Sequence, residues 1–205
     1  MSVSRLRIKH FFSHPFLLIT LLLLFLCFSC RSVPPSIPKA IMGTGRMTQE
    51  QLVSFFLMQT ALAQTEEVDQ EKVERLAGYY VKESSAEGIN ADIAFAQMCL
   101  ETGFLRFGGL VTADMNNFCG LGAINAENPG LVFPDEQTGV RAHIQHLKAY
   151  ASAEPLKLPS VDPRYRYVNP KGKAPHIYNL AGTWASDPAY GHKIDQLLRR
   201  MYAGL

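Results

Sequence analysis

An apolar helical segment between Ala91 and Phe104 constrains the fold of this chain more than any other stretch. Five of its residues recur at the i, i+3 and i+4 spacings of a single helix face, namely Ile93, Ala94, Gln97, Met98 and Glu101. Asn90 is a favourable N-cap, and Gly103 is a favourable left-handed cap at the other end. The sequence therefore predicts a helix that begins after Asn90 and carries Glu101 in its last turn.

Glu101 stands where a purely structural carboxylate is unfavourable. The C-terminal end of a helix dipole is negative, and the apolar neighbours Met98, Leu100 and Phe104 exclude water from the carboxyl group. Both effects raise the pKa of the side chain. A carboxylic acid that keeps its proton near neutral pH can act as a general acid. The alternative is an exposed glutamate at a helix end with no catalytic role.

The first 29 residues have the layout of an export signal. Three basic residues precede an apolar run over residues 16–28, which is short for a transmembrane helix. A small residue followed by Cys30 ends this region, a pattern that resembles a bacterial lipoprotein signal. We therefore expect residues 1–29 to be a signal peptide and Cys30 to be the lipidated first residue of the mature protein. Cys27 is an alternative anchor residue, and a plain N-terminal membrane anchor is a second alternative; each predicts export.

Residues 30–46 contain prolines and glycines with little apolar periodicity, so we expect them to form a tether. Residues 47–205 have the size of one domain. The chain has 20 Lys and Arg and 18 Asp and Glu. Removal of the three basic residues of the signal leaves 17 basic residues, which nearly balance the 18 acidic ones. This near-neutral charge does not indicate a nucleic-acid partner.

The domain is expected to be mainly helical. Thr48-Gln-Glu-Gln51 has the pattern of a capping box that opens one helix, and another helix is expected over residues 68–86. A further helix is expected over residues 136–152. Asp187 followed by Pro188 is typical of an N-cap with proline in the first helical position, and so predicts the start of the last helix.

An irregular lobe is expected over residues 108–135, which are too rich in glycine and asparagine for a long helix. A short hairpin is expected around Asn128-Pro-Gly130. A loop with several prolines follows the next helix, over residues 155–175. No internal repeat is present, so the coarse prediction is a single, mainly helical domain with one irregular lobe.

Cys99 and Cys119 are the cysteines of the expected domain. In an oxidising compartment they can form a disulfide that joins the Glu101 helix to the loop after it. The alternative is two thiols buried in a core. Sequence spacing does not determine the distance between the two Cα atoms, so both alternatives stay open.

His143 and His146 lie three residues apart on an expected helix, a spacing that can bind zinc. Cys119 with a histidine could form a thiol peptidase site. Neither arrangement has further partners in a recognisable pattern. We therefore expect the two histidines on a solvated helix face, with no metal site and no cofactor.

Four motifs occur in an order that is more specific than any one of them alone. They are Ala96-Gln-Met-Cys-Leu-Glu-Thr-Gly-Phe104, Asn116-Asn-Phe-Cys-Gly-Leu-Gly122, Gly139-Val-Arg-Ala-His-Ile-Gln-His-Leu147 and Trp184-Ala-Ser-Asp-Pro-Ala-Tyr-Gly191. Together they resemble the bacterial glucosaminidase domain, glycoside hydrolase family 73, whose members cut peptidoglycan beside N-acetylglucosamine. The resemblance covers nearly the whole expected domain. It implies a lysozyme-like α+β fold, mainly helical, with a small irregular or β lobe beside a cleft.

The resemblance also implies that Glu101 is the catalytic acid. A glycosidic oxygen must gain a proton as its bond breaks, and the sugar ring passes through an oxocarbenium-like state. In family members a second glutamate comes from a hairpin after the Asn-Asn-Phe-x-Gly motif, and Glu127 lies nearest to that place. Other candidates in the irregular lobe are Asp114, Asp135 and Glu136. If none of them acts, the acetamide of the substrate could be the nucleophile.

Five residues are candidates for binding the sugar: Asn117, Phe118, Tyr178, Trp184 and Tyr190. The Asn117 amide could bond a sugar hydroxyl or an N-acetyl group, or it could hold the turn. Trp184 offers an aromatic face to a sugar ring, although a single tryptophan before a helix is also typical of a core. Many relatives carry tyrosine at this point of the motif. Any role of that hydroxyl in orienting the acetamido group would fall here to Tyr178 or Tyr190.

These observations predict an exported peptidoglycan hydrolase, an endo-β-N-acetylglucosaminidase held to the membrane by an N-terminal lipid. We expect a monomer that acts on peptidoglycan glycan strands in the periplasm or at the cell surface. A lytic transglycosylase is one alternative, because it also needs a single glutamate but forms an anhydro sugar. A non-catalytic module that binds the cell wall is the other.

Overall fold

The computed structural model describes residues 36–64 and 68–204. Residues Ile37–Leu205 form one compact unit, which contains all the elements below. The expected signal peptide over residues 1–29 and the expected lipidation site Cys30 lie outside the described residues. Of the helices in the described part, none combines the length and apolar character needed to cross a membrane.

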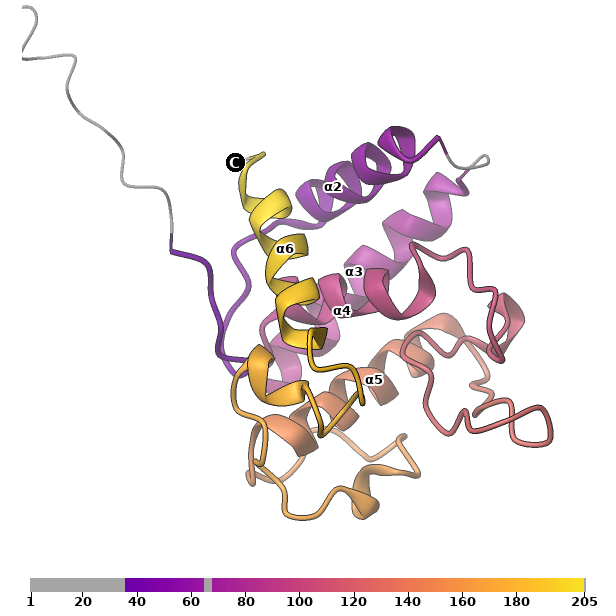
Figure 1. Cartoon of the computed structure of the whole chain (residues 1–205), viewed down its shortest axis with the longest axis vertical. Helices are drawn as coiled ribbons and strands as arrows, with labels where there is room; N and C mark the ends of the chain where they lie inside the picture. Colours follow the sequence, from indigo (N-terminus) through magenta and orange to yellow (C-terminus); the bar gives the residue numbers. More distant parts are fainter. Residues whose placement is uncertain (1–35, 65–67, 205) are drawn as a thin grey trace, which may run out of the picture. The chain divides into compact units, whose positions relative to one another are not determined.

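Helices make up most of the regular structure of the domain (Figure 1). In chain order the elements are α2 (Gln49–Leu62), α3 (Gln70–Glu87), α4 (Ala91–Thr102), η1 (Ala113–Met115), α5 (Glu136–Ala151), η2 (Tyr165–Tyr167), η3 (Ile177–Leu180) and α6 (Tyr190–Tyr202). Within residues 36–64 and 68–204, pairing between extended segments is limited to isolated bridges. The prediction of a mainly helical domain is therefore confirmed.

α4 forms the centre of the domain. It packs against α2, α3, α5 and α6, and all its residues except Leu100 and Glu101 are buried. The Asn90 side chain accepts two N–H groups of the first turn, at 3.0 and 3.3 Å, and Gly103 ends the helix with a φ of +58°. Both predicted caps are confirmed. The enclosed body of the helix thus supports the one turn that reaches the surface.

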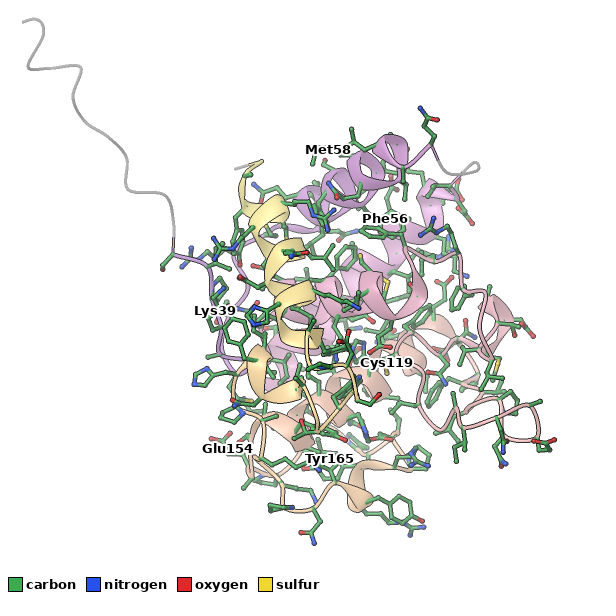
Figure 2. All side chains as sticks on the ribbon, viewed as in Figure 1. Lys39, Phe56, Met58, Cys119, Glu154 and Tyr165 are labelled. Atoms are coloured by element: carbon green, nitrogen blue, oxygen red, sulfur yellow. The ribbon has the colours of Figure 1, made fainter. Side chains whose placement is uncertain are left out.

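The segment of residues 37–46, here called the N-terminal strap, is packed on the domain. Ile41 is fully buried, its N–H donates to the Pro175 carbonyl oxygen at 3.0 Å, and its own carbonyl accepts the N–H of the α4 N-cap at 2.9 Å. Lys39, labelled in Figure 2, forms an ion pair with Asp195 of α6. The prediction of a tether is wrong for the strap, because its backbone and apolar side chains find partners far along the chain.

Asp92, in the first turn of α4, connects the strap to the last helix. Its carboxylate accepts the N–H groups of Arg46 at 2.7 Å and Met47 at 3.2 Å, and it also accepts the hydroxyl of Tyr202 in α6. Asp92 is fully buried. Three donors therefore replace the water that this carboxylate loses on folding.

Two local predictions are wrong in position. α6 begins at Tyr190, because Asp187 closes a turn ahead of the helix: its carboxylate accepts the N–H of Ala189 at 2.8 Å and its carbonyl that of Tyr190 at 3.1 Å. In the irregular lobe, Asn125 and Asn128 form an antiparallel bridge across a tight turn, so the chain reverses a few residues before the expected hairpin around Asn128-Pro-Gly130. In both places a side-chain-capped turn competes with the predicted element.

Candidate active site

Glu101, in the last turn of α4, meets two donors from the chain around the start of α6. The indole N–H of Trp184 donates to Glu101 Oε1 at 2.9 Å, and the hydroxyl of Tyr190 donates to the same oxygen. Among the residues that the structure describes, none bonds to Oε2. The two carboxyl oxygens therefore differ in their surroundings, because the described residues bond only Oε1.

The surroundings of Glu101 raise its pKa above that of an ordinary glutamate. The side chain is exposed to solvent on one side, while protein atoms crowd the carboxyl group on the others. The resulting desolvation is the largest cause of the shift, and the hydrogen bonds from Tyr190 and Trp184 act in the opposite direction. Because Oε1 already accepts two hydrogen bonds, Oε2 is the oxygen that is free to carry the proton of the neutral acid.

Trp184 is held in place by aromatic neighbours from α5. Its ring lies 5.2 Å from that of Tyr150 and 5.3 Å from that of His146. The Tyr150 hydroxyl also donates to the Thr183 carbonyl oxygen at 3.1 Å. These contacts direct the indole N–H toward Glu101, so the main visible task of Trp184 is to donate to the carboxyl group.

Tyr190, the first residue of α6, is buried, and its hydroxyl oxygen accepts a Gln97 Nε2–H at 2.9 Å. Its position depends on the close approach of α6 to η3. A Cβ on Gly191 would lie 2.6 Å from the carbonyl oxygen of Ile177, a contact that real Cβ atoms essentially never make. The glycine of the fourth motif therefore lets Tyr190 reach the last turn of α4.

Asn117 holds the irregular lobe together from inside, and Phe118 anchors the lobe in the main core. Asn117 Nδ2 donates to the carbonyl oxygens of Leu121 at 2.9 Å and Leu131 at 3.0 Å, and its Oδ1 accepts the Leu121 N–H at 2.9 Å. Asn117 is 1% exposed, and Phe118 is fully buried. Their assignment as sugar contacts is wrong, because the lobe encloses Asn117 and Phe118 packs into the main core of the domain. The turn-holding alternative describes Asn117.

Tyr178 and Glu127 lie apart from the contacts of Glu101. The Tyr178 ring, in η3, is 5.0 Å from that of His192, and Lys39 Nζ is 5.5 Å from its centre. Glu127 is exposed in the tight turn of the irregular lobe. In the described part of the chain, no hydrogen bond or ring contact joins either residue to Glu101.

The two histidines of α5 are buried, so their predicted place on a solvated face is wrong. α5 is covered by α3 and by η2, which leaves His143 fully buried and His146 8% exposed. Burial lowers the pKa of His143 to about 3, and His146 Nδ1 pairs with Asp162 Oδ2 at 2.7 Å. Across residues 36–64 and 68–204, no group of three or more His, Cys, Asp or Glu side chains is placed to hold a metal ion.

Cys99 and Cys119 are free thiols, and both are buried. Cys119 is labelled in Figure 2, among the packed side chains of the domain. Burial raises the pKa of each thiol well above its ordinary value, so neither is a ready nucleophile. Of the two alternatives left open by the sequence, the structure shows the buried thiols.

Gln97 is also a member of the site. The sequence pattern predicted only that it lies on the same helix face as Glu101. It lies one turn before Glu101, is fully buried and bonds Tyr190 on one side and His143 on the other. An amide on an otherwise apolar face, one turn from the acid, was the available signal. The sequence could not show which residues it meets, because both partners come from other helices.

Comparisons with known proteins cover the elements that carry this site. Residues 77–203 match the family model described as Glucosaminidase, mannosyl-glycoprotein endo-beta-N-acetylglucosaminidase. An uncharacterized protein of Borreliella burgdorferi is 42% identical over 158 residues, which are 77% of this chain and 74% of that protein. The crystal structure of S. aureus autolysin E in complex with muropeptide NAM-L-Ala-D-iGlu has a TM-score of 0.51 at 13% identity, covering 84% of this chain and 74% of that chain.

The structural likeness confirms the predicted fold class, a mainly helical, lysozyme-like domain. The family match spans α4, α5 and α6 and includes Glu101, Trp184 and Tyr190. The chain therefore belongs to the glucosaminidase family.

Proposed function

We propose that this protein is a peptidoglycan hydrolase, an endo-β-N-acetylglucosaminidase in which Glu101 is the general acid. One observation carries the proposal: Trp184 and Tyr190 both donate to Oε1 of a carboxyl group whose pKa is raised by desolvation. A raised pKa favours the protonated form that a general acid needs. Family membership supports the class of bond that is cut, and the muropeptide bound to autolysin E supports peptidoglycan as the substrate.

The reaction begins when Glu101 Oε2 gives its proton to the glycosidic oxygen. The bond from that oxygen to C1 of the sugar breaks, and positive charge develops on the ring. Negative charge grows on the carboxyl group as the proton leaves, and the two hydrogen bonds to Oε1 stabilise it. Trp184 and Tyr190 therefore stabilise the transition state more than the resting acid.

The nucleophile is assigned to the substrate itself. Glu127, the candidate named from the motif, lies in an exposed turn apart from the contacts of Glu101. The acetamide oxygen would attack C1 as the leaving oxygen takes the proton. Water would then attack C1 and open the ring so formed, and its proton would return to Glu101. The same single-carboxylate site favours a second candidate, a lytic transglycosylase, in which a hydroxyl of the sugar attacks and an anhydro sugar results.

Digestion of purified sacculi, with products identified by mass spectrometry, tests the proposal. A glucosaminidase releases fragments that end in reducing N-acetylglucosamine, a lytic transglycosylase releases anhydro sugars, and a wall-binding module releases neither. We expect reducing ends, their loss in Glu101→Gln, and retained activity in the control Glu127→Gln. Release that survives Glu101→Gln would refute the role of this residue.

We also propose that the protein is exported, is held to the membrane by a lipid on Cys30, and acts as a monomer. The sequence pattern over residues 1–30 and a substrate that lies outside the cytoplasm support this placement. Cys30→Ser should abolish incorporation of labelled fatty acid and move the protein to the soluble fraction. Cys27→Ser is the matched control and should change neither. Lipid labelling that persists in Cys30→Ser would contradict the assignment.

A further inference from the structure

A chain of buried hydrogen bonds runs through the core from α3 to Glu101. The Tyr80 hydroxyl meets His143 Nδ1 at 2.8 Å, and His143 Nε2 meets Gln97 Oε1 at 3.1 Å. Gln97 Nε2 then meets the Tyr190 hydroxyl at 2.9 Å, and Tyr190 donates to Glu101. α3, α5, α4 and α6 each supply a member, and none of the four residues behind Glu101 is more than 5% exposed.

One direction of donation satisfies every group in this chain when Glu101 is ionised. A carboxylate only accepts, so Tyr190 must give its single proton to Glu101. The Tyr190 oxygen then accepts, which turns the N–H side of the Gln97 amide toward it and the carbonyl oxygen toward His143. His143 must therefore carry its proton on Nε2 and accept the Tyr80 hydroxyl on Nδ1.

The protonation states of the buried members agree with this direction. Burial lowers the pKa of His143 to about 3, so the ring is neutral and has one donor and one acceptor. Burial also raises the pKa of Tyr80 well above its ordinary value, so its hydroxyl stays a donor. A protonated imidazole would present a second N–H to the Tyr80 hydroxyl and break the order of the chain.

We propose that Tyr80, His143 and Gln97 are positioning residues that hold the Tyr190 hydroxyl proton toward Glu101 Oε1 and so keep the acid proton on Oε2. The inference rests on the proposed role of Glu101 as general acid. If Tyr80 lost its hydroxyl, the imidazole could take either tautomer and the Gln97 amide could turn over. Tyr190 could then donate to Gln97, and Glu101 would lose a fixed donor.

The groups that face Glu101 allow this effect to be isolated. They are Tyr190 on α6, His143 on α5, Cys119 in the irregular lobe and the pair of His146 with Asp162 behind Trp184. Burial keeps the Tyr190 hydroxyl and the Cys119 thiol neutral by raising their pKa values. Tyr80→Phe leaves all of these side chains in place and acts on Glu101 only through its bond to His143, so a shifted Glu101 pKa reports on the hydrogen-bond chain.

Two variants interrupt the chain at different links, and a third is a matched control. Tyr80→Phe removes the terminal donor, and Gln97→Met removes the amide while keeping a side chain of similar length. Tyr202→Phe is the control, because it also removes a buried hydroxyl that bonds a carboxylate, that of Asp92, but lies outside the chain. The pKa of Glu101 is measured by NMR titration of ¹³C-labelled glutamate side chains, with Glu101→Gln identifying its signal.

We expect the Glu101 pKa to rise in Tyr80→Phe and in Gln97→Met, because a donor that favours the ionised form is no longer held in place. The control Tyr202→Phe should leave it unchanged. In kinetics on peptidoglycan, kcat should fall about tenfold in both chain variants at constant KM, a part of the 10²–10⁴-fold typical of general acid catalysis. An unmoved Glu101 pKa in both variants, or an equal shift in Tyr202→Phe, would overturn the inference. The titration needs no turnover, so it separates this outcome from a failure of the proposed hydrolase activity.

Discussion

Glu101 holds its two carboxyl oxygens in different surroundings, because Trp184 and Tyr190 both donate to Oε1. The ionised form is stabilised on that oxygen, yet partial burial still raises the pKa of the whole group. Two properties of Glu101 can therefore be measured. One is the loss of folding stability when it ionises, and the other is the increase in kcat that its two hydrogen-bond donors provide. Each leads to a separate experiment.

The first prediction concerns stability against pH. The folded-state pKa of Glu101 is raised above the ordinary value of 4.5, so ionisation favours the unfolded state as pH rises through this range. Glu101→Gln should therefore have a higher Tm than the parent at pH 8, with the difference disappearing near pH 4. Thermal unfolding followed by circular dichroism measures this. Glu127→Gln, at an exposed position, should show no such pH dependence; a parent as stable as Glu101→Gln at pH 8 would count against a raised pKa.

The second prediction concerns the Trp184 donor. Trp184→Phe keeps an aromatic ring beside Tyr150 and His146 but removes the N–H that bonds Glu101. We expect kcat to fall about 10- to 100-fold, the range for one hydrogen bond to a charged group. The alkaline limb of the pH–rate profile should move to higher pH, since this hydrogen bond lowers the Glu101 pKa. Tyr202→Phe, which removes a buried hydroxyl outside the site, is the control. An unmoved alkaline limb in Trp184→Phe would be the contrary result.

At the scale of helices, the sequence predicted the ends of a helix best where a capping residue marks them. The capping box at Thr48, the N-cap Asn90 and the left-handed Gly103 are all found in the structure. The start of α6 was missed because Asp187 followed by a proline also fits a turn. Burial of α5 on two sides was missed because periodicity shows which residues are apolar, whereas the partners of polar residues such as His143 come from distant elements.

The third prediction concerns the packing of the irregular lobe on α5. A Cβ on Gly139 would lie 1.8 Å from the backbone oxygen of Asn116, and neither backbone can move away cheaply. Gly139→Ala should therefore destabilise the protein by about 3 kcal/mol. The matched control is Gly78→Ala inside α3, where the nearest atoms, at 3.1 Å, belong to the flexible Gln49 side chain.

Gly78→Ala should lie within about 1 kcal/mol of the parent and on the stabilising side, because alanine favours a helix interior. Urea unfolding followed by circular dichroism measures both variants. Equal effects at Gly139 and Gly78 would show that the lobe does not depend on close contact with α5.

For the molecule as a whole, contacts between residues far apart in the sequence determine the features that the sequence did not predict. Composition placed the start of the domain at residue 47, yet the strap contributes Ile41 to the core. The N–H groups of Arg46, the last residue of the strap, and of Met47 after it also donate to Asp92. The site shows the same division. Glu101, Trp184 and Tyr190 were named from motifs and lie together, whereas the link from Gln97 to Tyr80 joins helices whose pairing no local pattern states.

The fourth prediction places the functional boundary of the domain. A chain that starts at Ile37 should keep the Tm and the peptidoglycan-cleaving activity of the longer protein. A chain that starts at Met47 should lose about 3–5 kcal/mol of stability, since it exposes the Ile41 site and removes the Arg46 N–H from the buried Asp92. Denaturant unfolding of the two chains measures the difference, and equal stability would mean that the strap is dispensable.

The strap also decides how the domain would respond to mechanical load. A pull from the N-terminal side meets the ion pair of Lys39 and the backbone bonds of Ile41 before it reaches Asp92 at the base of α4. The strap would therefore detach first, while the helices stay folded and Glu101 keeps its geometry. In an optical trap this predicts a small early rupture that precedes global unfolding, and a single all-or-none rupture would contradict it.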